Sequence, residues 1–366
     1  MLRTNCCPVL IPLFFLIFTH STLCRADSSF DTSSQDQDEK NLIVNEQLNL
    51  FEGSQIKEGD AEREFIPQQP TGTSGGRMFK ELLNPGPSNN PQPKCPSQVK
   101  TRVHELDVGT EVFYYRYEEP AYLTIYNTTT SRITNAGPML GYYANYAYRP
   151  ADPNFFNNFL TNVYMLQVRY AGSRDLEYKG SGVIKDKHDD VLEFRGLIGK
   201  DYNIGADSRV TPYFGFGYRY LLDRGDGQIS STGNWDYDRK SHYYYLPLGG
   251  DAVINMPQDW AVDFNAEYDI FLQGWEKSYL SDGDQFTGLD IPNLTNHQDH
   301  GFGVRGSIKF IKKGSMVDFY VEPYIRFWDI DYSKAETLTI DGVTTVPLVE
   351  PRNSTTEVGT KFGILF

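Results

Sequence analysis

Two short segments carry side chains of the types that activate water for hydrolysis. One contains Asp236 and Asp238, and the other contains Asp299 followed directly by His300. Carboxylate and imidazole groups are the side chains that commonly act as general bases and general acids. Adjacent residues of an extended chain project to opposite faces, so Asp299 and His300 would diverge. We therefore interpret all four as solvated loop residues and expect no catalytic residue, with hydrolase activity as the alternative.

Other patterns that would indicate a reaction or a ligand are weak. Ser241 and His242 are adjacent, so they would diverge in the same way. No glycine-rich phosphate loop, zinc-ligand spacing or nucleophile elbow is present. The acidic turns at 223–227 and 282–284 lack the run of ligands that a calcium loop needs. We expect no cofactor and no metal, and the net charge of -14 argues against a nucleic-acid partner.

Charged side chains recur at every second position of several segments and alternate with apolar ones. In residues 317–327, for example, Phe319 and Ile325 alternate with Glu322 and Arg326. A barrel of about 8–10 strands is only wide enough for side chains to fill, and an unpaired buried ion costs several kcal/mol. We predict a salt-bridged, narrow or plugged lumen, although any polar face of this size would carry mixed signs. The predicted lumen network consists of Arg169, Glu193, Arg195, Arg219, Asp263, Glu267, Asp269, Arg305, Lys309, Asp318, Glu322, Arg326 and Lys361.

The segments that carry these side chains have the period of two that is typical of β-strands. Their apolar face is rich in Phe, with Tyr near the strand ends, as in the aromatic girdles of membrane barrels. A soluble sandwich would show the same alternation but would bury the apolar face. We predict an all-β fold, a single up-and-down antiparallel transmembrane β-barrel of about ten strands, with 8–12 as the range. The predicted strands cover residues 106–117, 137–149, 160–175, 190–201, 209–222, 241–254, 259–273, 299–312, 315–330 and 354–366.

The connections between these strands should alternate between short periplasmic turns and long outer loops. The sixth connection (255–259) and the eighth (312–316) are short. The second (149–159) is longer than a periplasmic turn should be. The long connections, which we expect outside, are the third, fifth, seventh and ninth, at 176–189, 223–240, 274–298 and 331–353.

The last residues of the sequence alternate and end on an aromatic side chain. Gly359, Phe362, Ile364 and Phe366 resemble the C-terminal insertion signal of Gram-negative outer-membrane β-barrel proteins. The resemblance implies integral insertion into the bacterial outer membrane, with the barrel-insertion machinery and outer-membrane lipid as partners. The aromatic segment 213–220, with its alternating glycines, is similar to uncharacterised barrels of this class.

A ten-strand barrel also resembles the omptin-like proteases in size. That resemblance implies a rim site in which an acidic pair faces an Asp/His pair, with Asp236, Asp238, Asp299 and His300 as the matching residues. The spacing of Asp299 and His300 departs from the omptin pattern, which puts the protease activity in doubt.

The N-terminal part has the composition of a leader followed by an unstructured arm. Arg3 and the apolar run Val9–Phe18 predict a signal peptide over 1–26 and Sec export, with a lipidated Cys24 as the alternative. Residues 27–104 form an acidic arm rich in Pro, Gly and Gln, which we expect to be disordered. The barrel domain then spans 105–366, and Cys95 would be the only cysteine left after processing.

Taken together, these features predict a surface-exposed structural or interaction protein of the outer membrane. Its long loops would contact an extracellular or host ligand. A narrow substrate-specific channel or porin is the first alternative, and an omptin-like rim protease is the second.

Overall fold

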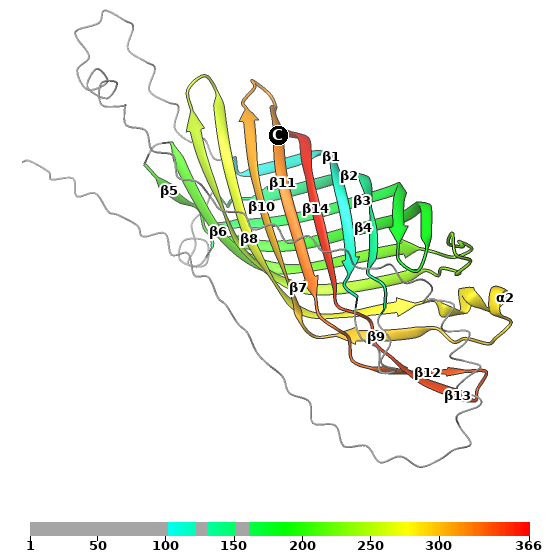
Figure 1. Cartoon of the computed structure of the whole chain (residues 1–366). Coiled ribbons are helices and arrows are strands. Elements are labelled where there is room, and N and C mark those ends of the chain that lie inside the picture. The colour runs from blue at the N-terminus through cyan, green and yellow to red at the C-terminus, as the bar shows by residue number, and fades with distance from the viewer. Residues whose placement is uncertain (1–101, 122–129, 151–160, 206) are drawn as a thin grey trace, which may run out of the picture. The chain divides into compact units, whose positions relative to one another are not determined.

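The computed structural model describes residues 102–366, apart from 122–129, 151–160 and 206. The predicted signal peptide, nearly all of the predicted arm and Cys95 lie outside the described residues. The described part is almost entirely β-structure (Figure 1). None of its helices has the length and apolar character that crossing a membrane would require.

Ten long antiparallel strands in this part form a closed barrel, as the sequence predicts. Each strand is hydrogen-bonded to the next along the chain, and the last pairs with the first. Most strands extend a few residues beyond their predicted bounds. The barrel strands are β1 (His104–Glu119), β2 (Ile133–Tyr148), β3 (Val163–Lys179), β4 (Val183–Gly199), β6 (Ser208–Arg224), β7 (Arg239–Met256), β8 (Trp260–Ser278), β10 (Gly301–Lys312), β11 (Asp318–Ile330) and β14 (Asn353–Leu365).

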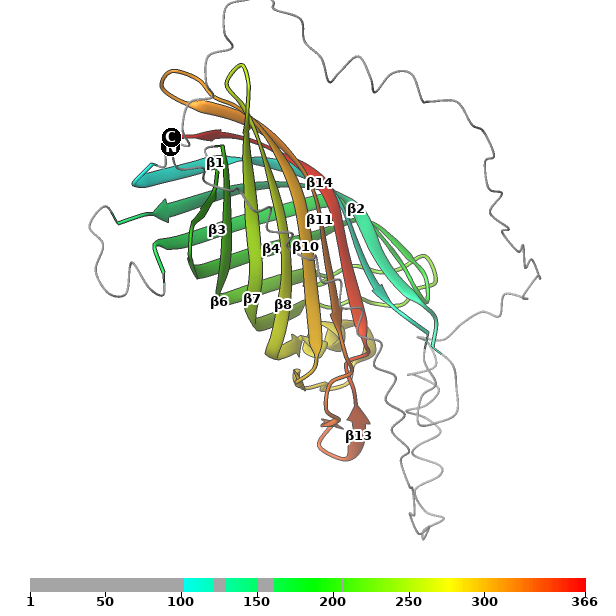
Figure 2. The same cartoon turned by 90° about the vertical axis from the view of Figure 1, so that its left-hand side faces the viewer.

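The barrel closes between β1 and β14. Their register runs from Asp107 opposite Leu365 to Glu118 opposite Ser354. At the end of this ladder, Leu106 and Phe366 exchange backbone hydrogen bonds of 3.3 and 2.8 Å. Figures 1 and 2 show β11, β14 and β1 side by side. Closure of this kind removes the free edges that an open sheet would expose.

The burial of alternate residues is inverted relative to a water-soluble protein. On β11, Glu322 is 4% exposed and Arg326 is 6% exposed, whereas Phe319 and Ile325 are 57% and 50% exposed. The charged face therefore lines the interior and the apolar face forms the outer wall. A soluble sandwich would bury the apolar face instead. This difference rules out the sandwich that the alternation alone leaves open.

One end of the barrel carries short turns, and we call it the short-turn end. β7 and β8 are joined through residues 257–259, and β10 and β11 through residues 313–317. Between β4 and β6 lies the small strand β5 (Tyr202–Ile204), which pairs with β6. The first and last barrel strands also begin and end here. Most of the second connection, which is long for a turn, lies outside the described residues.

The opposite end, which we call the long-loop end, contains more regular structure than the sequence indicates. After β8 come the short helices η3 (Leu280–Gly283) and α2 (Asp284–Thr287), and then β9 (Leu294–Gln298), which pairs with the end of β8. Between β11 and β14, β12 (Glu336–Ile340) and β13 (Thr344–Leu348) form a hairpin. The seventh and ninth connections are therefore structured rather than open loops.

The prediction of a long third connection is wrong. β3 and β4 continue through most of residues 176–189 and meet at the turn 180–182. Leu176, Ile184 and Lys187 point inward and are buried, which extends the interior toward the long-loop end. This part of the two strands extends beyond the apolar part of the outer wall, so its outward residues are charged. These charges made the stretch look like a loop in the sequence.

Candidate functional site

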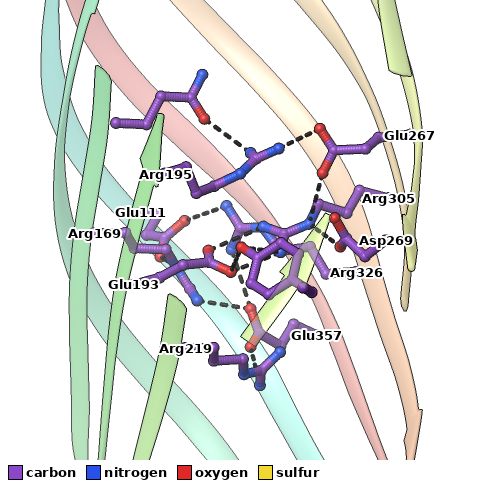
Figure 3. A network of polar contacts seen from close by, with 12 residues as sticks. Glu111, Arg169, Glu193, Arg195, Arg219, Glu267, Asp269, Arg305, Arg326 and Glu357 are labelled. Carbon is purple, nitrogen blue, oxygen red and sulfur yellow. Dashed lines mark hydrogen bonds and ion pairs between the residues drawn. The ribbon is translucent and has the colours of Figure 1, made fainter. Parts of the chain in front are cut away.

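The interior of the barrel is the candidate site, and its middle is a layer of five arginines and five carboxylates. Figure 3 shows how their side chains converge from the surrounding strands. In most of these ion pairs, the two side chains come from different strands. The layer therefore joins strands that are far apart in the sequence. Its members are Glu111, Arg169, Glu193, Arg195, Arg219, Glu267, Asp269, Arg305, Arg326 and Glu357.

Glu357 on β14 is the centre of one half of this layer. Its carboxylate accepts hydrogen bonds from Arg169 at 2.6 Å, Arg326 at 3.0 Å and Arg219 at 3.1 Å. Glu111 on β1 accepts from Arg326 at 3.1 Å and also pairs with Arg169. Both glutamate side chains are fully buried. Three arginines thus share two carboxylates across five strands.

Arg305 on β10 organises the other half. Its guanidinium contacts Glu193 at 2.6 Å and Asp269 at 2.7 Å. Arg195 pairs with Glu267, which also accepts a 2.7 Å hydrogen bond from the Tyr213 hydroxyl. Charged groups removed from water must pair and hydrogen-bond to offset desolvation, and equal numbers of each sign allow this. The layer is therefore a neutral, cross-linked plug of side chains.

A layer of apolar and aromatic side chains lies next to the charged layer, toward the long-loop end. Tyr245 and Trp328 are 0% and 2% exposed, and their rings meet edge to face with centroids 4.9 Å apart. The Arg305 guanidinium lies 5.4 Å from the Tyr245 ring, which joins the two layers. Gly217 makes this packing feasible, because a Cβ there would overlap the Tyr245 ring. The remaining large members of the layer are Phe113, Tyr115, Tyr117, Met139, Leu176, Leu221, Tyr243, Phe271 and Ile330.

Toward the short-turn end, the charged layer borders a polar cavity of about 180 Å³. Lys309 lies across it, 3.2 Å from Asp107 and 3.5 Å from Glu322. Glu322 also pairs with Lys361 at 2.8 Å. Asp263 lines the same cavity. Water can therefore enter the interior from the short-turn end, but only as far as the charged layer.

Asp318 is the predicted lumen residue that lies nearest the short-turn end. It pairs with Arg102 at 3.1 Å and accepts a backbone hydrogen bond from Gly314 at 3.0 Å. Its place is the rim of the barrel rather than the charged layer. Ion pairs are therefore distributed over the whole length of the interior, from this rim to the long-loop end.

A second ionic cluster, the mouth cluster, fills the interior at the long-loop end. Arg239 at the start of β7 pairs with Asp223 at 2.8 Å, Glu119 at 2.9 Å and Glu350 at 3.8 Å. Lys187 pairs with Asp223 at 2.7 Å and with Asp236. Burial and the nearby Glu276 and Glu119 carboxylates raise the pKa of Glu350 well above its ordinary value, against the effect of Arg239. Sequence reasoning missed this cluster, because most of its residues lie at strand ends where alternation is short.

The residues weighed as catalytic candidates do not form one site. Asp236 is engaged by Lys187, and the Asp238 carboxylate accepts the backbone N–H groups of Gly225 and Asp226 at 3.0 and 3.1 Å. Asp299 and His300 are exposed where β9 leads into β10, and Asp299 pairs with Lys334, which lowers its pKa. In the described residues, no hydrogen bond or ion pair joins the two sets. The same part of the chain contains no cluster of three or more residues placed to hold a metal ion.

The residues of the predicted C-terminal insertion signal lie on the wall at the closure. Phe362 and Phe366 are 48% and 47% exposed and face outward. Gly359 lies opposite Phe113 of β1, where a Cβ would overlap the neighbouring strand. The apolar outward face of β14 and the close β1–β14 contact are thus properties of the same strand.

Comparison with solved structures agrees on the fold. The outer membrane protease OmpT from Escherichia coli superposes with a TM-score of 0.50 at 9% identity, covering 72% of this chain and 96% of that one. The translocator domain of the autotransporter NalP from Neisseria meningitidis matches with a TM-score of 0.33 at 8% identity, covering 74% and 90%. No protein-family model and no curated protein sequence matches the chain. The fold is that of the outer-membrane β-barrels.

Proposed function

We propose that this chain is an integral outer-membrane barrel with a closed lumen that acts at the cell surface as a structural or interaction protein. The observation that carries the proposal is the combination of an apolar outer wall with an interior filled by paired charges and aromatic rings. The apolar outer wall supports a membrane location, and the filled interior argues against a pore.

The outer wall supports membrane insertion. Exposed apolar side chains cover every barrel strand, including Leu166, Phe214, Leu248 and Phe319, each more than half exposed. Burying apolar surface contributes roughly 25 cal/mol per Å², so a wall of this kind in water would be strongly unfavourable. An apolar surface that extends over every strand of a barrel marks contact with lipid or with another protein.

The interior supports a closed lumen. A solute that enters the cavity at the short-turn end meets the ten-residue charged layer and then the aromatic layer. A cavity near the mouth cluster has a volume of only about 20 Å³, close to that of a single water molecule. A channel would need a continuous path of larger cross-section. The narrow-channel alternative is therefore less consistent with this packing.

The long-loop end supports a role in interaction. Ile291, Leu294, Leu338 and Ile340 form a small hydrophobic core outside the barrel, which links the β8–β10 connection to the β12–β13 hairpin. Asn296 of β9 donates a hydrogen bond to Ser333 at 3.1 Å within this assembly. Such an ordered platform can present a fixed surface to a ligand outside the cell. We propose no catalytic step at this end, because Asp236 and Asp299 are engaged by lysines and Asp238 by backbone N–H groups.

Two measurements on the purified protein test this proposal. Folded membrane barrels migrate faster than the boiled protein on a gel and float with lipid vesicles, and we expect both behaviours here. In planar bilayers, we expect no steady unitary current from the wild-type protein. Behaviour as a water-soluble globule would contradict the membrane location, and steady conductance would contradict the closed lumen and favour the channel.

A further inference from the structure

An aromatic cluster covers the outer wall near the long-loop ends of β6, β7 and β8, which lie side by side in Figure 1. The His242 ring lies between those of Tyr220 and Trp275, with centroid distances of 5.0 and 5.1 Å. Tyr244 lies 5.3 Å from Trp275 and 5.2 Å from Tyr218. We call these five residues the aromatic slab. In an inserted barrel, this level of the wall corresponds to the boundary between acyl chains and headgroups.

Two lysines lie directly beyond the slab. Lys240 of β7 and Lys277 of β8 occupy opposed positions in the ladder, and both point outward. Their ammonium groups lie 4.3 and 4.6 Å from the centre of the Tyr279 ring. Lys240 also donates a 3.1 Å hydrogen bond to the Tyr279 hydroxyl. The two charges therefore converge on one phenol ring.

These two lysines differ from three other outward cations near the same end. Arg116, Arg224 and Arg352 each lie 2.7 Å from a carboxylate. No carboxylate of the described residues forms an ion pair with Lys240 or Lys277. Like charges at directly opposed positions of a sheet destabilise it, so the arrangement favours an anion that neutralises both. The lowered pKa of Tyr279, caused first by its hydrogen bond to Lys240, reflects the same excess of positive charge.

We propose that Lys240, Lys277 and Tyr279 bind the phosphate group of a lipid headgroup in the outer leaflet, with the aromatic slab packing against the rest of that lipid. The two ammonium groups and the phenol hydroxyl supply donors for phosphate oxygens. The amphipathic rings of Tyr and Trp suit the headgroup boundary. This inference rests on the proposed membrane location and adds a specific lipid contact to it.

The test uses the full chain in detergent and follows the fluorescence of its tryptophans, of which Trp275 belongs to the slab. The probes are inorganic phosphate, dispersed phosphatidic acid and dispersed phosphatidylcholine, which lacks net negative charge. We expect phosphatidic acid to bind more tightly than either of the others. The variant Lys240→Gln/Lys277→Gln should weaken that binding on the order of tenfold or more, because it removes both cations that face the anionic headgroup.

Two control variants complete the design. Lys240→Arg/Lys277→Arg keeps both charges and should retain binding, whereas Lys179→Gln/Lys334→Gln removes two cations that already pair with carboxylates and should change little. Equal binding by the wild type and the Gln variant would overturn the site. Binding of inorganic phosphate as tightly as phosphatidic acid would overturn the assignment to lipid. Gel mobility and vesicle flotation of the same samples report separately whether the membrane location fails.

Discussion

Glu357 illustrates how single side chains hold this interior together. It belongs to the last strand, yet its three arginine partners come from β3, β6 and β11. Removing one partner from a buried ionic group typically costs about 3–5 kcal/mol, because the remaining charge loses its compensation. A misregistered β14 would leave three arginines without this carboxylate. The charged layer therefore penalises wrong registers of β14.

Glu350 gives the mouth cluster a dependence on pH. Its pKa is raised in the folded protein, so the folded state holds a proton that the unfolded state releases. The stability that this proton contributes is fully present below the ordinary glutamate pKa of about 4.3 and is lost as pH rises from there through the raised pKa. We predict that the melting temperature of the barrel in detergent falls as pH rises over this range. Glu350→Gln, which cannot ionise, should flatten the profile, and an unchanged slope in that variant would contradict the prediction.

The sequence predicts individual lumen residues well only where contrast along a strand is strong. On β11, Phe319 and Ile325 against Glu322 and Arg326 define the two faces without ambiguity. Glu357 was not predicted, because many neighbouring positions on both faces of its strand are Thr or Gly and the two faces show little contrast. Glu111 is the other member of the charged layer that was not identified, although it follows Asp107 and Gly109 on the inward face of β1.

Among the strands, the β1–β14 closure is the most demanding contact. A methyl group at Gly359 would overlap Phe113 and the carbonyl oxygen of Val112. Gly359→Ala must therefore push β14 away from β1, and overpacking of this kind costs typically about 1–3 kcal/mol. We predict a smaller heat-modifiable fraction after refolding into vesicles. Gly250→Ala is the matched control, since the nearest atom to its new Cβ would be 3.6 Å away. Equal folded fractions for the two variants would show that the closure tolerates the side chain.

All ten strands were predictable because the membrane imposes alternation on them, but their ends were not. Within the belt, the outward face must be apolar, and this produces the period of two. Beyond it, as in residues 176–189, the outward face meets water and becomes polar, and register shifts between the two strands disturb the period. The β12–β13 hairpin was also missed, because its small core is assembled with residues of another connection rather than within its own segment.

As a whole, the molecule has two seals in series, one ionic and one apolar. The ionic layer contains charged groups that water can reach from the cavity at the short-turn end. The aromatic layer is lined by rings and aliphatic side chains rather than by charged groups, and hydrophobic constrictions block ions by excluding water. We therefore infer that the aromatic layer, rather than the charged layer, is the tighter barrier to ions.

The double variant Tyr245→Ala/Trp328→Ala tests this ranking. Both rings are buried in the aromatic layer, so removing them leaves a void that water can enter from the adjoining layers. We predict that the refolded variant conducts small ions in planar bilayers, whereas the wild type does not. The control variant is Tyr244→Ala/Phe327→Ala. It removes the outward-pointing rings next to Tyr245 and Trp328 in the sequence, and it should leave the lumen closed. If the inward variant, shown to be folded by its gel mobility, also fails to conduct, the charged layer alone is a sufficient seal.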